Sequence, residues 1–151
     1  MKIISSTSLF YAVEEVYSCL ERYVQDREYP LLLKSKDGVG YFNFDLKQLV
    51  LVERNFIKMN NITGIGWINE KECLIMNDKN TYHYAIINQA LKQKSVHPSN
   101  LLFGQNEMVM KTWIISHIDE QQDSNIPIFY AVVQKETSEG KKYPAMKLKI
   151  K

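Results

Sequence analysis

The sequence is poor in cysteine and arginine and contains no long apolar run. Only two of its 151 residues are cysteines, Cys19 and Cys73, and their separation matches no metal-binding motif. This excludes a disulfide-rich scaffold and favours two buried free thiols in a reducing compartment. No stretch approaches the roughly 18 apolar residues that a membrane-spanning helix needs. Serines interrupt the apolar start Met1–Ile4, so we expect no signal peptide, no membrane partner and a cytoplasmic location.

Arginine is outnumbered by lysine, with three arginines among 19 basic residues. The planar arginine fork is the usual means of bidentate phosphate or guanine recognition, so its scarcity disfavours arginine-based reading of base edges. The net charge is only +2, which does not indicate a strong polyanion binder. The charge is uneven, however, because residues 135–151 carry six lysines and two glutamates.

Strong catalytic motifs are also missing. The chain has no phosphate-binding loop, no dinucleotide-binding glycine motif, no HExxH, no paired CxxC and no GxSxG elbow. Gly64-Ile65-Gly66 is followed by Trp67 and a strand-like run, which favours a tight turn or bulge over phosphate binding. His83, His117 and Asp119 have no spacing that would place two of them on one helix face, so we expect neither a metal site nor a cofactor.

The 45% hydrophobic content is that of an ordinary globular protein, and we expect a single α+β domain over residues 1–151. A curved, mainly antiparallel sheet would be packed by one or two helices. The first helix is predicted from Leu9 to about Arg27, because apolar residues recur at three- and four-residue steps before Pro30. The second is predicted from Asp78, a good N-cap, to about Lys94, with Tyr82 on its apolar stripe.

Strands are predicted where β-branched and aromatic residues gather between turn residues. The predicted strands cover residues 31–33, 39–44, 49–53, 64–68, 73–76, 108–118, 126–134 and 145–150. Residues 64–76 are expected to form a hairpin, and the last three strands to be antiparallel neighbours.

The histidines are the first enzymatic candidates because histidine exchanges protons near neutral pH. If the protein is an enzyme, His83 and His117 would be its catalytic pair, in a metal-independent phosphodiesterase or nuclease. The sequence does not bring them together, and neither has the threonine or serine two residues on that paired-histidine phosphoesterases use. Ordinary surface or half-buried histidines are the competing interpretation.

The C-terminal residues 145–150 alternate strictly between apolar and basic, so a strand would place Lys147 and Lys149 on one face. Such lysines ordinarily discourage edge-to-edge aggregation, but they could also contact phosphates. Aromatic residues are numerous, and they often anchor interfaces or stack on bases. The predicted ligand- or partner-binding residues are Tyr82, Tyr84, Trp67, Lys141, Lys142, Lys147 and Lys149.

Three functions survive these observations. Because strong catalytic motifs are absent, the leading hypothesis is a small cytoplasmic binding protein that sequesters a protein partner stoichiometrically. An inhibitor, an immunity-type protein or a phage counter-defence protein would act in this way. The alternative is a nucleotide- or nucleic-acid-directed module, either a binding protein or the histidine-dependent nuclease. A homo-oligomer with a structural role is a third possibility.

Overall fold

The described part of the chain is built almost entirely from β-strands. The computed structural model describes residues 1–3, 6, 12–18, 29–44, 52–69, 71–88, 90–99, 104, 106–116 and 128–150. These residues form twelve strands and no α-helix. The α+β prediction is therefore wrong, because the sheets pack against each other and no helix in this part of the chain packs on them.

The strands follow one another in two groups. The first group is β1 (Glu15–Ser18), β2 (Tyr29–Ser35), β3 (Gly38–Phe44) and β4 (Val52–Lys58). The second is β5 (Ile62–Trp67), β6 (Glu72–Asn77), β7 (Asn80–Ile87), β8 (Ala90–Pro98), β9 (Met108–Ser116), β10 (Ile128–Thr137), β11 (Gly140–Lys142) and β12 (Ala145–Lys149).

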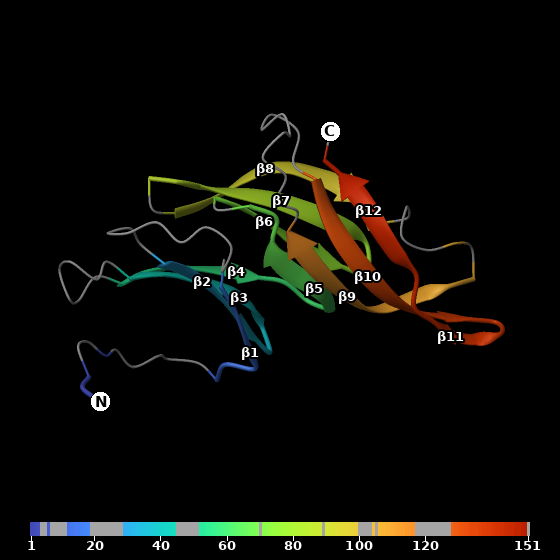
Figure 1. The fold of residues 1–151 in the computed structure, drawn as a ribbon, viewed down its shortest axis with the longest axis horizontal. Coiled ribbons are helices and arrows are strands. Elements are labelled where there is room, and N and C mark those ends of the chain that lie inside the picture. Colours follow the sequence, from blue (N-terminus) through green and yellow to red (C-terminus); the bar gives the residue numbers. More distant parts are fainter. Residues whose placement is uncertain are drawn as a thin grey trace.

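Each group forms one sheet. The small sheet has the order β1-β2-β3-β4, and every neighbouring pair in it is antiparallel. The large sheet has the order β11-β10-β9-β5-β6-β7-β8, with β12 also paired to β10. Figure 1 shows the small sheet lying below β6 to β8 and to the left of β5, while β9, β10 and β12 continue the large sheet beyond it.

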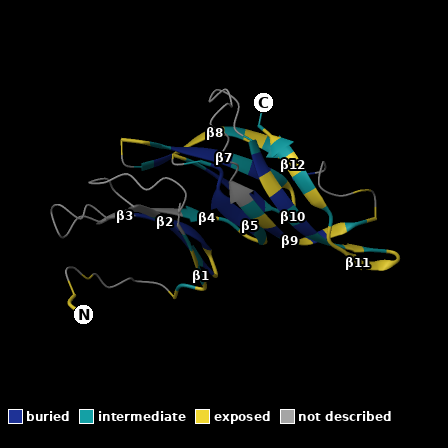
Figure 2. Cartoon of the chain, in the orientation of Figure 1, coloured by how far each residue is buried: buried dark blue, intermediate teal, exposed yellow. Residues whose placement is uncertain are grey.

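The main core lies between the two sheets. Leu32, Val39 and Tyr41 of the small sheet pack against buried residues of the large sheet, among them Trp67 and Ile75. The apolar face of the small sheet could not be buried without this second layer. One large-sheet face is therefore covered along β5 to β8, and Figure 2 shows β5, β6 and β7 as mostly buried.

A second core lies on the opposite face of the large sheet. Leu74 and Met76 of β6 pack there with Phe129, Ala131 and Val133 of β10. These strands are separated in the sheet by β5 and β9, so the sheet must curl strongly to bring them together.

Glycine makes the curl possible at the junction of β5 and β9. This is a parallel pairing with only two registered pairs, Gly64 with Thr112 and Ile65 with Trp113. A Cβ added to Gly64 would lie 2.8 Å from the backbone oxygen of Thr112, and one added to Gly66 would lie 2.9 Å from the Cβ of Ile114. The register also shifts between Ile62 and Gly64. These glycines thus serve close strand approach in a bulged strand.

The first predicted helix is wrong where the structure describes it. Residues 15–18 of its centre form β1, which pairs with β2 in the register Glu15 to Lys34. Val16, which the helical spacing would place on an apolar stripe, is exposed, whereas Tyr17 packs on the main core. Backbone pairing with β2 therefore overrides the helical spacing. The rest of that prediction, including residues 19–28 with Cys19, lies outside the described residues.

The second predicted helix is also wrong, because residues 78–94 form most of the β7–β8 hairpin. Ile87 pairs with Ala90 across a two-residue turn, and Asn88 adopts the positive φ of 53° that such turns require. β7 is buried on both faces, with Thr81 and His83 on one and Tyr84 on the other. Apolar and polar residues therefore do not alternate along β7, so the spacing of its apolar residues resembles that of an amphipathic helix.

Most of the remaining strand predictions are confirmed. Residues 31–33, 39–44, 64–67 and 73–76 lie in strands, and the last two ranges form the predicted hairpin. β9, β10 and β12 are the three predicted C-terminal strands, and β10 is antiparallel to both of the others. Of the predicted strand 49–53, residues 52 and 53 belong to β4 and residues 49–51 lie outside the described part.

Candidate functional site

The small sheet covers only part of the large-sheet face, and the remainder carries a cluster of lysines and aromatic rings. Strand register places its residues in rows. Trp113 of β9 is paired with Val132 of β10, which is paired with Ala145 of β12. In adjacent rows Lys147 is paired with Tyr130, and Lys111 with Gln134. Cross-strand partners project from the same side of a sheet, so these side chains share one surface.

We call this surface the lysine–aromatic face. It consists of Lys111, Trp113, Tyr130, Tyr143, Lys147 and Lys149. Tyr143 joins it because its hydroxyl accepts a hydrogen bond of 3.3 Å from Nε2 of Gln134. Trp113, Tyr130 and Tyr143 are 41%, 37% and 56% exposed, which is high for large aromatic side chains.

Two of the rings lie next to lysine ammonium groups. Lys111 Nζ is 5.2 Å from the centroid of the Trp113 ring, and Lys147 Nζ is 5.9 Å from that of Tyr130. These distances are within the range of cation–π attraction. The face therefore combines large aromatic rings with positive charges that lie close to them.

The predicted alternation of the C-terminal strand is confirmed. Met146, Leu148 and Ile150 pack against the second core, and Lys147 and Lys149 are exposed on the other side. Figure 2 shows exposed and partly buried residues alternating along β12. Lys151 lies outside the described residues.

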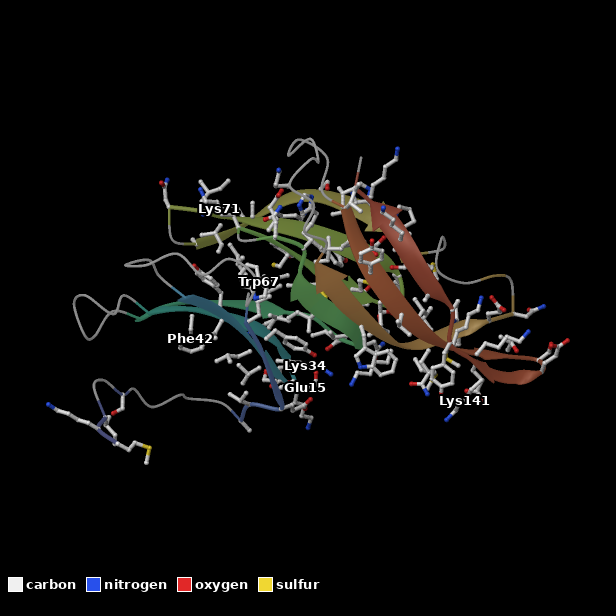
Figure 3. All side chains as sticks on the ribbon, in the orientation of Figure 1. Glu15, Lys34, Phe42, Trp67, Lys71 and Lys141 are labelled. Carbon is white, nitrogen blue, oxygen red and sulfur yellow. The ribbon has the colours of Figure 1, made fainter. Side chains whose placement is uncertain are left out.

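Lys141 and Lys142 lie on β11, in the hairpin that projects beyond the sheet (Figure 3). Both are exposed, and Lys142 Nζ forms a salt bridge of 3.1 Å with Glu139. Their register partners on β10 are Glu136 and Lys135. These lysines thus form a flank of the lysine–aromatic face with part of their charge compensated.

A cleft of about 560 Å³ lies where the rim of the small sheet meets β5, β9 and β10. Glu15 and Tyr17 of β1 and Lys34 of β2 form one wall, and Lys111 and Trp113 line the other. Figure 3 shows Glu15 and Lys34 together at this rim. Because Lys111 and Trp113 also belong to the lysine–aromatic face, the cleft opens onto it.

Glu15 is the anionic group of the cleft. The Tyr17 hydroxyl donates to its Oε2, and Lys111 Nζ lies 3.5 Å from its Oε1. The Tyr17 hydrogen bond and the nearby lysines lower the pKa of Glu15, against the opposing effect of partial burial. Burial and the same hydrogen bond raise the pKa of Tyr17, so its hydroxyl keeps its proton and donates. Trp67 Nε1 donates to the Tyr17 carbonyl at 3.3 Å, which ties β1 to the core.

The predicted aromatic binding residues do not belong to this surface. Trp67 and Tyr84 are almost fully buried in the core between the sheets, and Tyr82 packs against the same core. Tyr82 and Tyr84 do line a second, shallower cleft beside Asn77 and Asp78, where the β6–β7 turn lies near the end of β4. Trp67 therefore has a structural role, holding the edge strand through its indole N–H.

His83 lies in a polar cluster on the opposite face of the large sheet. Its Nε2 is 3.0 Å from Oε1 of Glu72, although its N–H is not aimed well enough for a hydrogen bond. Its Nδ1 is 3.5 Å from Oγ of Ser95, which contacts Nε2 of His97 at 2.9 Å. Burial lowers the pKa of His83, with the Glu72 charge opposing it. Lys94 adds a salt bridge of 2.9 Å to Glu72.

Of the predicted catalytic pair, the structure describes only His83. His83 is paired with Leu74, whose side chain lies in the second core, so it points away from the lysine–aromatic face. His117 lies outside the described residues. In the described part of the chain, no group of three or more His, Cys, Asp and Glu side chains could hold a metal ion. Within the same part, no helix has the length and apolarity to cross a bilayer.

Sequence reasoning missed the residues that complete the site, namely Glu15, Tyr17, Lys111, Trp113 and Tyr130. The sequence contains a signal for two of them. Lys111 and Trp113 are two residues apart, which is the spacing of side chains on one face of a strand. Comparisons with protein-family models, curated proteins and solved structures give no match to this chain, so its own geometry carries the functional inference.

Proposed function

We propose that the protein binds single-stranded nucleic acid on the lysine–aromatic face, with little dependence on base sequence over most of that face. The observation that carries this proposal is the pairing of exposed rings with lysines, at Trp113 with Lys111 and at Tyr130 with Lys147. Unpaired bases stack on aromatic side chains, and lysines attract the phosphates between them.

A duplex fits this face less well than a single strand. Its bases are already stacked on one another, so they cannot lie against Trp113 or Tyr130. Lysines on an edge strand ordinarily prevent edge-to-edge aggregation, and this role accounts for Lys147 and Lys149. It does not account for large aromatic rings exposed beside lysines on the same surface. Binding of an unpaired strand accounts for both kinds of residue.

The test is a titration of a labelled ten-nucleotide oligo(dT), and of a duplex of the same length, at low salt. We expect the single strand to bind and to quench Trp113 fluorescence, whereas the other tryptophan, Trp67, is buried. Replacing Trp113 by Ala should remove about 1–3 kcal/mol of stacking. Val96→Ala, which truncates an exposed side chain on β8, is the control. Absence of binding, or equal binding by wild type and Trp113→Ala, would overturn the proposal.

Sequestration of a protein partner is the second candidate. It is favoured by exposed apolar side chains on the strands that border the cleft, Val16 on β1 and Met108 and Met110 on β9, of which Met110 lines the cleft itself. A nucleic acid strand offers little apolar surface to cover these side chains, whereas a protein interface would bury them. A stoichiometric complex with an acidic protein, lost in Met110→Lys and retained with excess oligonucleotide, would favour this candidate over the first.

A further inference from the structure

The cleft beside Trp113 has the features of a binding site for one flat, polar group. Its volume of about 560 Å³ lies in the usual range of small-ligand sites. Tyr17 and Trp113 provide aromatic surface, and Ile62 and Ile65 provide apolar surface. Among the described residues that line it, Glu15 is the one carboxylate. A ligand here must therefore satisfy an acceptor-only group.

We propose that this cleft takes a guanine base, with the Glu15 carboxylate accepting hydrogen bonds from its Watson–Crick edge. The inference rests on the proposed function, because the base would belong to a strand bound on the lysine–aromatic face. Lys111 and Trp113 belong to both surfaces, so a strand on the face has a direct path into the cleft.

The hydrogen-bonding pattern selects guanine among the bases. Guanine presents two adjacent donors, N1–H and the N2 amino group, which match the two oxygens of a carboxylate. Adenine and cytosine each place a ring acceptor beside their amino group, and uracil and thymine place acceptors on both sides of a single donor. Each of those bases would set a lone pair against Glu15, at a cost in desolvated charge.

Glu15 retains the capacity to accept these bonds. Its Oε2 accepts one hydrogen bond from Tyr17 and its Oε1 has one distant contact, with Lys111 at 3.5 Å. A carboxylate oxygen offers two lone-pair sites, so each oxygen has one left. The Tyr17 hydrogen bond also fixes the side chain, and the lowered pKa of Glu15 keeps it ionised at neutral pH. Lys34 on the same wall could meet a neighbouring phosphate.

The experiment compares oligo(dT) strands in which one central base is guanine, inosine, adenine or thymine. We expect the guanine strand to bind at least tenfold more tightly than the adenine or thymine strand, with inosine between them because it lacks the N2 amino group. Glu15→Gln should abolish the preference for guanine. Glu14→Gln removes the same charge one residue away, on an exposed side chain, and should retain the preference.

The outcomes separate this inference from the proposed function. If all four strands bind wild type equally, the guanine site is wrong but single-strand binding stands. If no strand binds, the proposed function itself fails. If Glu15→Gln and Glu14→Gln weaken or strengthen all strands equally, Glu15 acts only through its charge, and the guanine assignment is again wrong. Thermal melting of both variants checks that β1 remains docked.

Discussion

Salt should weaken binding to the lysine–aromatic face by an amount that the lysines determine. Lys111, Lys147 and Lys149 are the three lysines on this face. For a single strand the slope of log K against log salt is about −0.7 per phosphate neutralised, so three contacts give about −2. Raising the salt from about 50 to about 200 mM should then reduce affinity by about 20-fold.

Replacing Lys147 and Lys149 together by Ala should leave one contact, so the slope should fall to about −0.7 and the salt effect to about threefold. Fluorescence anisotropy of a labelled oligo(dT) in a series of KCl concentrations measures both slopes. Lys36→Ala with Lys71→Ala is the matched control, since both lysines are exposed in turns and the change in net charge is the same. A double variant at positions 147 and 149 that keeps the wild-type slope would refute the assignment.

Three further predictions concern the fold. Gly64→Ala should destabilise the protein by about 1–3 kcal/mol in urea denaturation, because the new Cβ would meet the Thr112 backbone; unchanged stability would contradict the close approach. His83 has a lowered pKa in the folded state, so the unfolded chain binds a proton first and stability should fall as the pH drops below 6.5. His83→Gln should flatten that decline in pH-dependent melting curves, and an equally steep decline would exclude His83 as its source. Cys73 is fully buried, which raises its thiol pKa, so a Cys19→Ser variant should react with a thiol reagent only after unfolding.

The sequence predicts the strands whose side chains alternate. In β12 the lysines face outward and Met146, Leu148 and Ile150 face the second core, so the period of two is unbroken. β9 and β10 contain β-branched and aromatic residues, which favour strands. The local sequence pattern is enough to predict a strand where one face of that strand is buried and the other is exposed to solvent.

Local pattern fails where burial is two-sided or where pairing partners are distant. β7 is buried on both faces, so Tyr82, Ala85 and Ile86 fit a helical stripe as well as a strand. β1 is a strand because β2 supplies its backbone partners, which helical spacing around Val16 does not reveal. The helix predictions failed for this reason, and the α+β class failed with them.

The candidate site depends on register even more than the fold does. Lys147 and Lys149 could be placed on one face from their spacing alone. Their position beside Tyr130 requires the β10–β12 register, and the position of Trp113 requires the β9–β10 register. The cleft further requires that the small sheet dock with Glu15 at its rim. The spacing of residues along the sequence does not reveal these neighbours, because they depend on strand register and on the packing of the two sheets.

The narrow junction between β5 and β9 has a consequence for the order of folding. β5 to β8 form one antiparallel meander and β9, β10 and β12 form another, each closed by sequence neighbours. Only two registered pairs join the meanders, and they close a long loop. Local hairpins form before such distant contacts, so we expect the junction to form late. Gly64→Ala should then speed unfolding and leave the refolding rate almost unchanged, and a slowed refolding arm would place the junction early instead. If the strands form in this order, the surface around Trp113 is completed only in the last step of folding.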